Sequence, residues 1–150
     1  MGKIMGKIII NIDGGSRGNP GPAALGVLIY DQKRNVFKKY SQYLGETTNN
    51  EAEYQALIFA FKKIKALFGK EKIKRMEVEI KSDSELLIKQ MRGEYKILEP
   101  KIQQLFLKAW NLKIDLGEIN FILIPREENK EADKLVNEIL DSQAKSQKLF

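Results

Sequence analysis

The sequence predicts an α/β fold in which one mixed five-stranded sheet is flanked by helices. Two observations lead to it. Apolar residues form blocks or alternate over five segments of strand length, which are 7–13, 23–30, 36–44, 76–83 and 118–125. Other segments repeat their apolar residues with the period of a helix. The first three strands follow one another without an intervening helix, so we expect them to be antiparallel.

The first strand, KIIINID at residues 7–13, ends at a Gly-Gly pair and places Asp13 at its end. Residues 16–22 (SRGNPGP) contain too much glycine and proline for regular structure. A polar turn at 31–35 joins the next two strands, the second of which is rich in aromatic and β-branched residues. The N-terminal third should therefore be an antiparallel meander.

Helices are predicted at 47–68, 84–91, 97–113 and 128–143. In the first helix, residues between Ala56 and Phe68 form one apolar face, and a Thr or Asn stands where an N-cap is needed. The second helix is short, with Ser82 or Asp83 as its N-cap. A single domain should cover 1–143, followed by a C-terminal tail, 144–150, that we expect to fray.

Composition excludes several kinds of chemistry. The chain has 150 residues with neither histidine nor cysteine, which removes Ser-His-Asp and Cys-His catalysis, disulfides and imidazole or thiolate metal ligands. No apolar run is long enough for a membrane span, and the N-terminus lacks the pattern of a signal peptide, so we expect a cytoplasmic protein. We also expect a monomer. The net charge of +6 favours polyanionic partners. Much of that charge lies between Lys62 and Arg75, where composition alone favours a solvated helix end and loop.

Four carboxylates are placed to converge on one cleft. Glu53 and Asp133 lie on the apolar faces of their helices, whereas Asp13 and Asp83 end strands, where ligand sites of open α/β sheets are found. Taken singly, each acid is better explained by an ordinary structural role such as a helix cap. Together they need a cation, because buried anions repel one another. An all-oxygen ligand set suits Mg²⁺ or Mn²⁺, and a pair of such ions can hydrolyse a phosphodiester.

Four segments of the chain resemble the signatures of the type 1 ribonuclease H family, and each contains one of the acids. In order they are IDGGSRGNPGPAALGVLI, TTNNEAEYQAL, SDSELLIKQM and NKEADKLV. The resemblance covers nearly the whole chain and implies a ribonuclease H-like fold. It also implies cleavage of the RNA strand of an RNA–DNA hybrid, leaving 3′-hydroxyl and 5′-phosphate ends.

The same resemblance implies two Mg²⁺ ions in the substrate complex, with Mn²⁺ as a substitute. Asp13 would bridge both ions, and Asp133 would hold the ion that activates water. Glu53 and Asp83 would hold the other ion, next to the leaving oxygen. Mutation of Asp13 to Asn should therefore abolish cleavage.

Substrate contacts are implied as well. Asn19 and Thr48 match positions that hold a DNA-strand phosphate, and the positions that match the RNA strand and minor groove are Gly14, Asn49, Asn50 and Glu85. Considered without the resemblance, Asn19 before a proline is typical of a turn, and the Asn and Thr residues are typical helix caps. At Gly14, the missing side chain would let backbone groups approach a 2′-hydroxyl, although a positive φ would explain this glycine equally well.

The chain departs from the family pattern in two places. Arg126 stands nearest to a loop histidine of many relatives; it cannot relay a proton but can bind a phosphate, and pairing with Glu127 or Glu128 is the alternative. The basic helix that longer members insert is missing. Hybrid binding would then depend on Arg92, Lys96, Lys101 and the cluster between Lys62 and Arg75. The chain thus resembles compact archaeal and bacterial members, and activity on double-stranded RNA stays open.

Three other functions would account for part of this pattern. A junction resolvase or integrase core shares the fold and the clustered acids, but the TTNNEAEYQAL and DGGSRGNPG segments argue against it. A non-catalytic nucleic-acid-binding module would be expected to lose one of the acids, and all four are present. A purely structural domain leaves acids on apolar helix faces unexplained.

Overall fold

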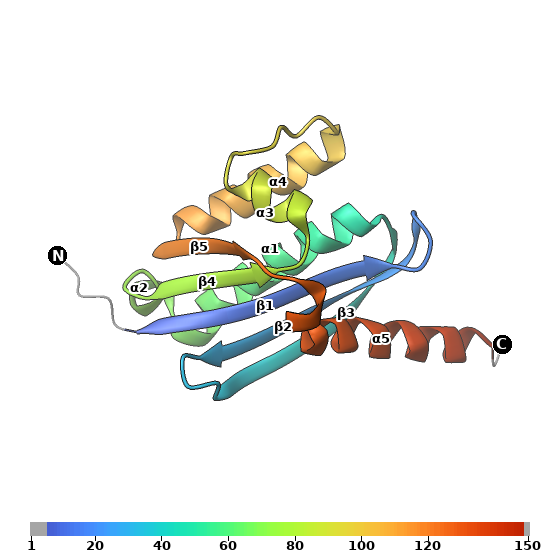
Figure 1. Ribbon diagram of the computed structural model, residues 1–150, viewed down its shortest axis with the longest axis horizontal. Helices are drawn as coiled ribbons and strands as arrows, with labels where there is room; N and C mark the ends of the chain where they lie inside the picture. The colour runs from blue at the N-terminus through green and yellow to red at the C-terminus, as the bar shows by residue number, and fades with distance from the viewer. Residues whose placement is uncertain (1–5, 149–150) are drawn as a thin grey trace.

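One mixed sheet with helices on both faces makes up residues 6–148, the part of the chain that the computed structural model describes (Figure 1). The strands are β1 (Lys7–Ser16), β2 (Gly21–Asp31), β3 (Val36–Thr47), β4 (Glu77–Ser82) and β5 (Glu118–Leu123). The helices are α1 (Asn49–Phe68), α2 (Lys70–Ile73), α3 (Glu85–Met91), α4 (Pro100–Ile114), the 3₁₀ helix η1 (Arg126–Glu128) and α5 (Lys130–Lys148).

The strand order is β3-β2-β1-β4-β5, with β1 at the centre. The β1–β2 and β2–β3 pairs are antiparallel, whereas β1–β4 and β4–β5 are parallel. The predicted mixed sheet with an antiparallel start is therefore confirmed. The β1–β4 and β4–β5 pairs are parallel because a helical crossover returns the chain to the end of the sheet at which the preceding strand began.

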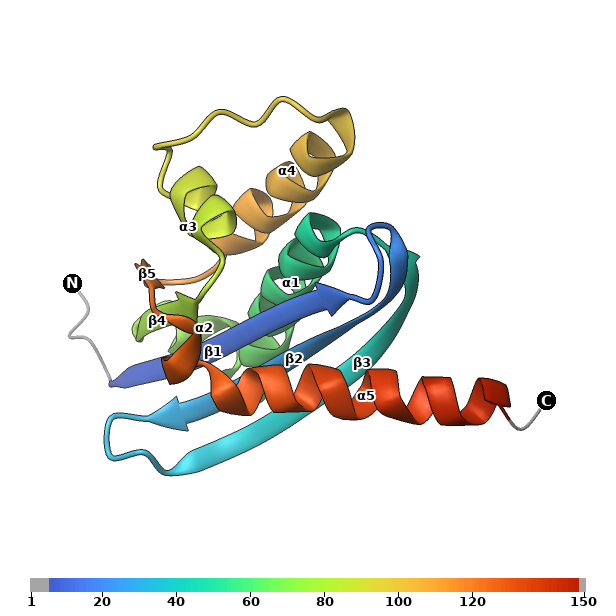
Figure 2. The same ribbon diagram turned by 45° about the vertical axis from the view of Figure 1, so that its right-hand side comes forward.

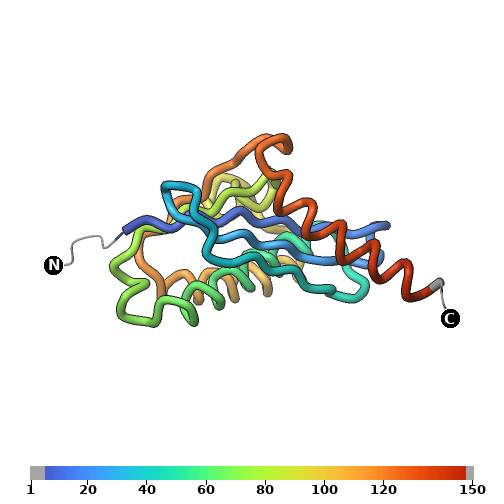
Figure 3. The backbone as a smooth tube through the Cα atoms, turned by 90° about the horizontal axis from the view of Figure 1, so that it is seen from below, coloured from blue at the N-terminus to red at the C-terminus, as the bar shows by residue number. Residues whose placement is uncertain are grey.

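The helices divide between the two faces of the sheet. Figure 3 shows α5 on one side, with α1 and α4 on the other. Along β1, Ile8, Ile10 and Ile12 belong to the main core that α1 covers. The intervening residues face the opposite side, as the alternation of a strand requires. Figure 2 shows α5 crossing β2 and β3. The helix packs closely on β2 at Gly26, which has no side chain; a Cβ there would collide with the Ala132 carbonyl oxygen.

Several element boundaries differ from the prediction. The β1–β2 pairing continues as far as Ser16 and Ala23, so β1 does not end at Asp13 and the irregular loop is shorter than 16–22. The N-cap of α3 is Ser84, whose hydroxyl accepts a hydrogen bond from the Leu87 amide at 3.2 Å. The N-cap prediction of Ser82 or Asp83 was therefore wrong.

The last helix is longer than predicted. Its first residue is Lys130 and it continues to Lys148, so an end at 143 was wrong and residues 144–148 are helical rather than frayed. Leu149 and Phe150 lie outside the described residues, and the division into a domain at 1–143 and a tail stays a prediction. Within residues 6–148, no helix combines the length and hydropathy that crossing a membrane requires.

Candidate active site

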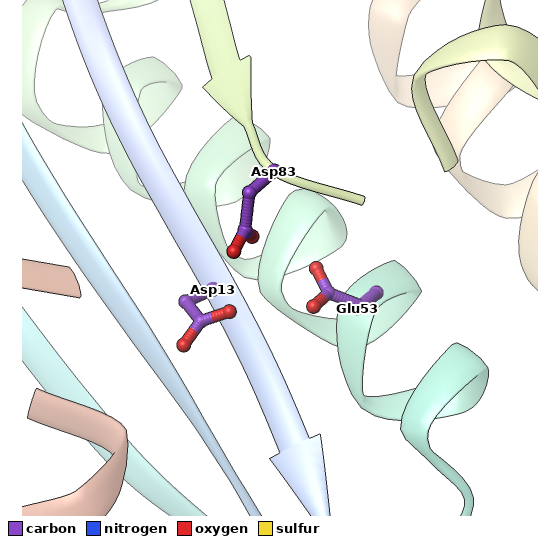
Figure 4. Close-up of side chains that lie close together, drawn as sticks. All are labelled: Asp13, Glu53 and Asp83. Carbon is purple, nitrogen blue, oxygen red and sulfur yellow. The ribbon is translucent and has the colours of Figure 1, made fainter. Parts of the chain in front are cut away.

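Asp13, Glu53 and Asp83 come together at the centre of the sheet. One carboxylate oxygen from each lies within 4.8 Å of those of the other two, and the three side chains point toward one another in Figure 4. The parallel register of β1 and β4 explains why two of them are neighbours. It pairs Asn11 with Lys81, so Asp13 and Asp83 both lie two residues beyond that pair.

The start of α1 brings in the third acid. Thr48 caps the helix as predicted: its hydroxyl accepts from the Glu51 amide at 3.2 Å, and Glu51 accepts from the Thr48 amide at 3.1 Å. The first turn of the helix lies directly on β1 at Gly14, where a Cβ would collide with the backbone of Ala52. This close approach sets Glu53 beside Asp13, and it gives Gly14 a packing role.

The cluster is electrostatically strained without a cation. Asp13 is 7% exposed, and burial together with the charges of Asp83 and Asp133 raises its pKa to about 8. Burial and the charges of Asp13 and Asp83 raise the pKa of Glu53 well above its ordinary value. The Oε2 atom of Glu53 is buried with no hydrogen-bond partner. Buried oxygens of this kind fit a hard divalent cation, which would neutralise the repulsion and occupy the free lone pairs.

Asp133 joins the same cavity from the other face of the sheet. It lines the cavity beside the other three acids, and its charge contributes to the raised pKa of Asp13. Its own side chain is exposed, so the prediction that it would be buried was wrong. The buried stripe of α5 consists of Ala132, Val136 and Leu140, and Asp133 lies at its margin. Glu53, in contrast, is 8% exposed, as predicted.

The acids open into a cavity of about 460 Å³. Its lining consists of Asp13, Gly14, Gly15, Ser16, Arg17, Asn49, Asn50, Glu53, Asp83, Ser84, Arg126, Asp133, Val136, Asn137 and Leu140. Three of the predicted RNA-strand residues are thus present in it, whereas Glu85 is not. Glu85 instead pairs with Lys89 at 3.4 Å and accepts a hydrogen bond from the Tyr95 hydroxyl.

The predicted phosphate-binding residues are engaged in local structure. The Asn19 side-chain oxygen accepts from the Asn49 amide at 3.1 Å, and the Asn49 side chain in turn accepts from the Ser16 amide at 2.9 Å. The Thr48 hydroxyl is occupied by its capping bond. These bonds connect the β1–β2 turn to the start of α1, so they shape the rim of the cavity even without substrate.

Arg126 contacts the acid cluster rather than its neighbours in the chain. Its Nε atom lies 3.8 Å from an Asp83 oxygen, and its side chain is 92% exposed. The alternative of pairing with Glu127 or Glu128 was therefore wrong. An ion pair this exposed adds little to stability, but it places a permanent cation at the mouth of the cavity.

A buried series of side-chain hydrogen bonds, which was not predicted from the sequence, ends at Asp83. The Tyr30 hydroxyl donates to the Asn11 side-chain oxygen at 2.6 Å, and the Asn11 amide donates to Asn129 at 3.1 Å. The Asn129 amide group then donates to the Ile12 carbonyl at 2.9 Å and to Asp83 at 3.4 Å. One signal was available: Asn11 interrupts an otherwise apolar strand. Because a backbone carbonyl only accepts, its bond from the Asn129 amide nitrogen fixes which end of that amide faces Asp83.

The basic candidates for hybrid binding lie outside the cavity. The cluster between Lys62 and Arg75 covers the far end of α1, α2 and the turn after it. The last residue of α1 lies about 22 Å from Glu53 along the helix axis. Lys101 pairs with Glu51 at 3.2 Å, and Arg92 donates to the Phe121 carbonyl at 2.9 Å. Their contribution to hybrid binding stays a prediction.

Known proteins with similar sequences and structures agree with this geometry. Residues 11–139 match the family described as Reverse transcriptase-like. Ribonuclease HI of Halobacterium salinarum is 35% identical over 91% of this chain and 65% of its own length. A bifunctional protein of Mycobacterium tuberculosis is 36% identical over 93% of this chain and 37% of its own length. The chain therefore belongs to the Reverse transcriptase-like family, and its domain is ribonuclease H-like.

A solved structure is similar to this chain over nearly its whole length. LC11 ribonuclease H1, isolated from compost by a metagenomic approach, superposes with a TM-score of 0.88 at 50% identity, covering 93% of this chain and 99% of that one. The same protein has been solved in complex with an RNA/DNA hybrid, at 48% identity to this chain. These matches support a hydrolase of the ribonuclease H class. The chain spans only 37% and 65% of the two curated relatives named above.

Proposed function

We propose that this chain hydrolyses the RNA strand of RNA–DNA hybrids with divalent metal ions held by its acid cluster. The single observation that best supports the proposal is the convergence of Asp13, Glu53 and Asp83, with a buried Glu53 oxygen that has no partner. Such an all-oxygen set favours a hard cation over a softer one. The hybrid complex of LC11 ribonuclease H1 supports the choice of substrate.

Each acid has a role in this proposal. Asp13 is central, because it is buried and its pKa responds to both Asp83 and Asp133, so it is suited to bridge two ions. Glu53 and Asp83 would hold one ion, which would stabilise the leaving oxygen, and the exposed Asp133 would hold the other, which would activate water. Bound divalent ions supply an activated water and stabilise the leaving oxygen, and the products carry 3′-hydroxyl and 5′-phosphate ends.

The surroundings of the cluster support the proposed action on the RNA strand. Gly14, Asn49 and Asn50 line the cavity, so backbone and amide groups are available to a 2′-hydroxyl next to the acids. Arg126 occupies the mouth, where it attracts a phosphate rather than relaying a proton. Asn19 and Thr48 shape the neighbouring turn that would receive the DNA strand.

A direct test uses one RNA sequence labelled at its 5′ end, paired with DNA or with RNA, and the matching DNA duplex. Each is incubated with Mg²⁺, with Mn²⁺ or with a chelator. We expect Mg²⁺-dependent cleavage of the RNA in the hybrid and none of the DNA duplex, with Mn²⁺ as a substitute. Cleavage that survives the chelator would refute the metal assignment. The double-stranded RNA arm decides the activity that the sequence left open.

The control is Glu53→Gln, which keeps the size of the side chain and removes the charge. It should lose cleavage while remaining folded by circular dichroism. Monomeric state and cytoplasmic location, both expected from the sequence, stay predictions. Gel filtration of the purified chain decides the first of them.

A further inference from the structure

The cavity that contains the acids extends beyond them along α5, and its charge is unevenly distributed. Four carboxylates surround the metal-binding end. Among the described residues that line it, positive charge comes from Arg126 at the acid cluster and from Arg17 at the α5 end. A nucleic acid strand that passes over the cluster carries a phosphate at every nucleotide, so each cation along its path matters for binding.

Arg17 is held in a defined position. It lies in the turn between β1 and β2, where its amide donates to the Pro22 carbonyl at 2.8 Å. Its guanidinium crosses to α5 and contacts Asp141 at 2.6 Å and the Asn137 side-chain oxygen at 3.3 Å. Asn137 also donates to the Asp133 carbonyl at 3.1 Å. The guanidinium is therefore anchored on the same helix as the fourth acid.

The distance from the acid cluster identifies what Arg17 could contact. Asn137 and Asp141 follow Asp133 by one and two helical turns, or about 6 and 12 Å along α5. Phosphates of one strand are spaced by about 3.4 Å along a duplex axis. Arg17 is thus too far along the groove to contact the phosphate that is cleaved, but it lies within reach of phosphates that flank it.

The present partner of Arg17 is replaceable. The side chains of Arg17 and Asp141 are 42% and 70% exposed, and ion pairs with this exposure contribute little net stability. A phosphate can accept two hydrogen bonds from a guanidinium in the same geometry as a carboxylate. Exchange of Asp141 for a phosphate would therefore cost little, and it would remove repulsion between Asp141 and the incoming strand.

We propose that Arg17 is a binding residue for a non-scissile backbone phosphate of the hybrid, and that Asp141 occupies its guanidinium until substrate arrives. The inference rests on the proposed function, since it assumes a hybrid in the cavity. The competing explanation is that the ion pair only fastens the β1–β2 turn to α5. Phosphate binding predicts that substitutions of Arg17 and Asp141 shift KM in opposite directions, whereas a purely structural pair predicts shifts in the same direction.

The test compares Arg17→Gln and Asp141→Asn in steady-state hybrid cleavage. If Arg17 binds a phosphate, Arg17→Gln raises KM about 3- to 10-fold at unchanged kcat and lowers the salt dependence of binding by about one unit of slope. Asp141→Asn frees the guanidinium and lowers KM about 2-fold. If the pair is only a fastener, both variants lower the melting temperature and shift KM in the same direction, which would overturn the proposal.

Matched controls come from the Lys39–Glu131 pair. It joins β3 to α5 across 3.7 Å with comparable exposure, and neither residue lines the cavity. Lys39→Gln and Glu131→Gln change the net charge by the same amounts as the test variants. We expect them to leave KM within about 2-fold of the native value, since surface charges away from the contact act weakly at physiological salt. Equal shifts in control and test variants would mean that net charge alone is responsible.

The phosphate that Arg17 contacts can be identified by removing the charge of one backbone phosphate at a time. Single methylphosphonates are placed in turn along each strand of the hybrid, and affinity is measured in a Glu53→Gln background so that cleavage does not interfere. One flanking position should weaken binding to the native Arg17 and have no effect with Arg17→Gln. The same penalty in both would refute the assignment. Failure of the native chain to cleave any hybrid would refute the proposed function, but these affinities would still decide the role of Arg17.

Discussion

Replacing Asp13 by Asn should stabilise the metal-free protein while it abolishes cleavage. The folded state raises the pKa of Asp13 to about 8 through burial and repulsion by Asp83 and Asp133. The unfolded chain binds this proton with an ordinary pKa near 4, so the native protein loses stability as pH rises from about 4 to about 8. At pH 7 the loss is about 4 kcal/mol if Asp13 bears it alone.

The coupled acids share this cost, so we expect Asp13→Asn to gain about 2 to 4 kcal/mol at pH 7, or about 5 to 15 °C in melting temperature. The assay is urea and thermal unfolding with a chelator at pH 4, 7 and 9. The gain should be small at pH 4 and reach its limit above pH 8. Mg²⁺ should reduce it, because the native cluster then gains the cation that Asn cannot hold as well.

The control for this experiment is Asp115→Asn. Its hydrogen bond and ion pair with Lys65 lower the pKa of Asp115, so its contribution to stability is present above an ordinary carboxyl pKa and is lost in acid. The substitution should therefore have no stabilising effect at neutral pH. The reasoning is refuted if Asp13→Asn is less stable than the native chain at pH 7, or if its gain does not depend on pH.

Other parts of the structure give three further predictions. Thr48→Ala removes the N-cap of α1 and should cost about 1 kcal/mol in urea unfolding; an unchanged midpoint would show that the capping bond contributes nothing. Tyr30→Phe leaves the buried Asn11 oxygen without its donor, so kcat should fall and half-maximal Mg²⁺ should rise at similar KM. A loss of thermal stability alone would instead assign this chain of bonds a purely structural role. Leu57→Ala empties a fully buried site and should cost about 3 kcal/mol by thermal unfolding, whereas a cost well under 1 kcal/mol would contradict the packing.

Sequence patterns predicted the sheet and most helices because both depend on local periodicity. The helical phase of Glu53 was sufficient to predict its burial. The apolar run of β1 located the strand that carries Asp13, although Asp13 lies within that strand and not at its end. Asp133 shows where this reasoning ends. Its spacing to Val136 and Leu140 is compatible with the buried stripe, but the side chain lies at the margin of that stripe and is exposed. Helical phase gives the direction in which a side chain points, but it does not show whether the neighbouring strands cover that side chain.

Long-range partners were the part that the sequence could not supply. Arg126 has acidic neighbours in the chain, yet it contacts Asp83, because β4 and β5 are parallel neighbours and the segments that follow them leave the sheet at the same end. The bond from Asn11 to Asn129 joins residues that are 118 positions apart. Such pairs depend on strand order and on the path of α5, neither of which has a local signal. Likewise, β1 extended past its glycines because β2 pairs with them.

The measurement that tests the central claim most directly is the rate of RNA cleavage in a hybrid as a function of Mg²⁺ concentration, for the native chain and Glu53→Gln. The account predicts a rate that rises from zero with Mg²⁺ in the native chain, and a loss of at least about 100-fold in the variant at every concentration. Comparable rates in the two proteins, or native cleavage without a divalent ion, would contradict the claim that these carboxylates hold the catalytic metal.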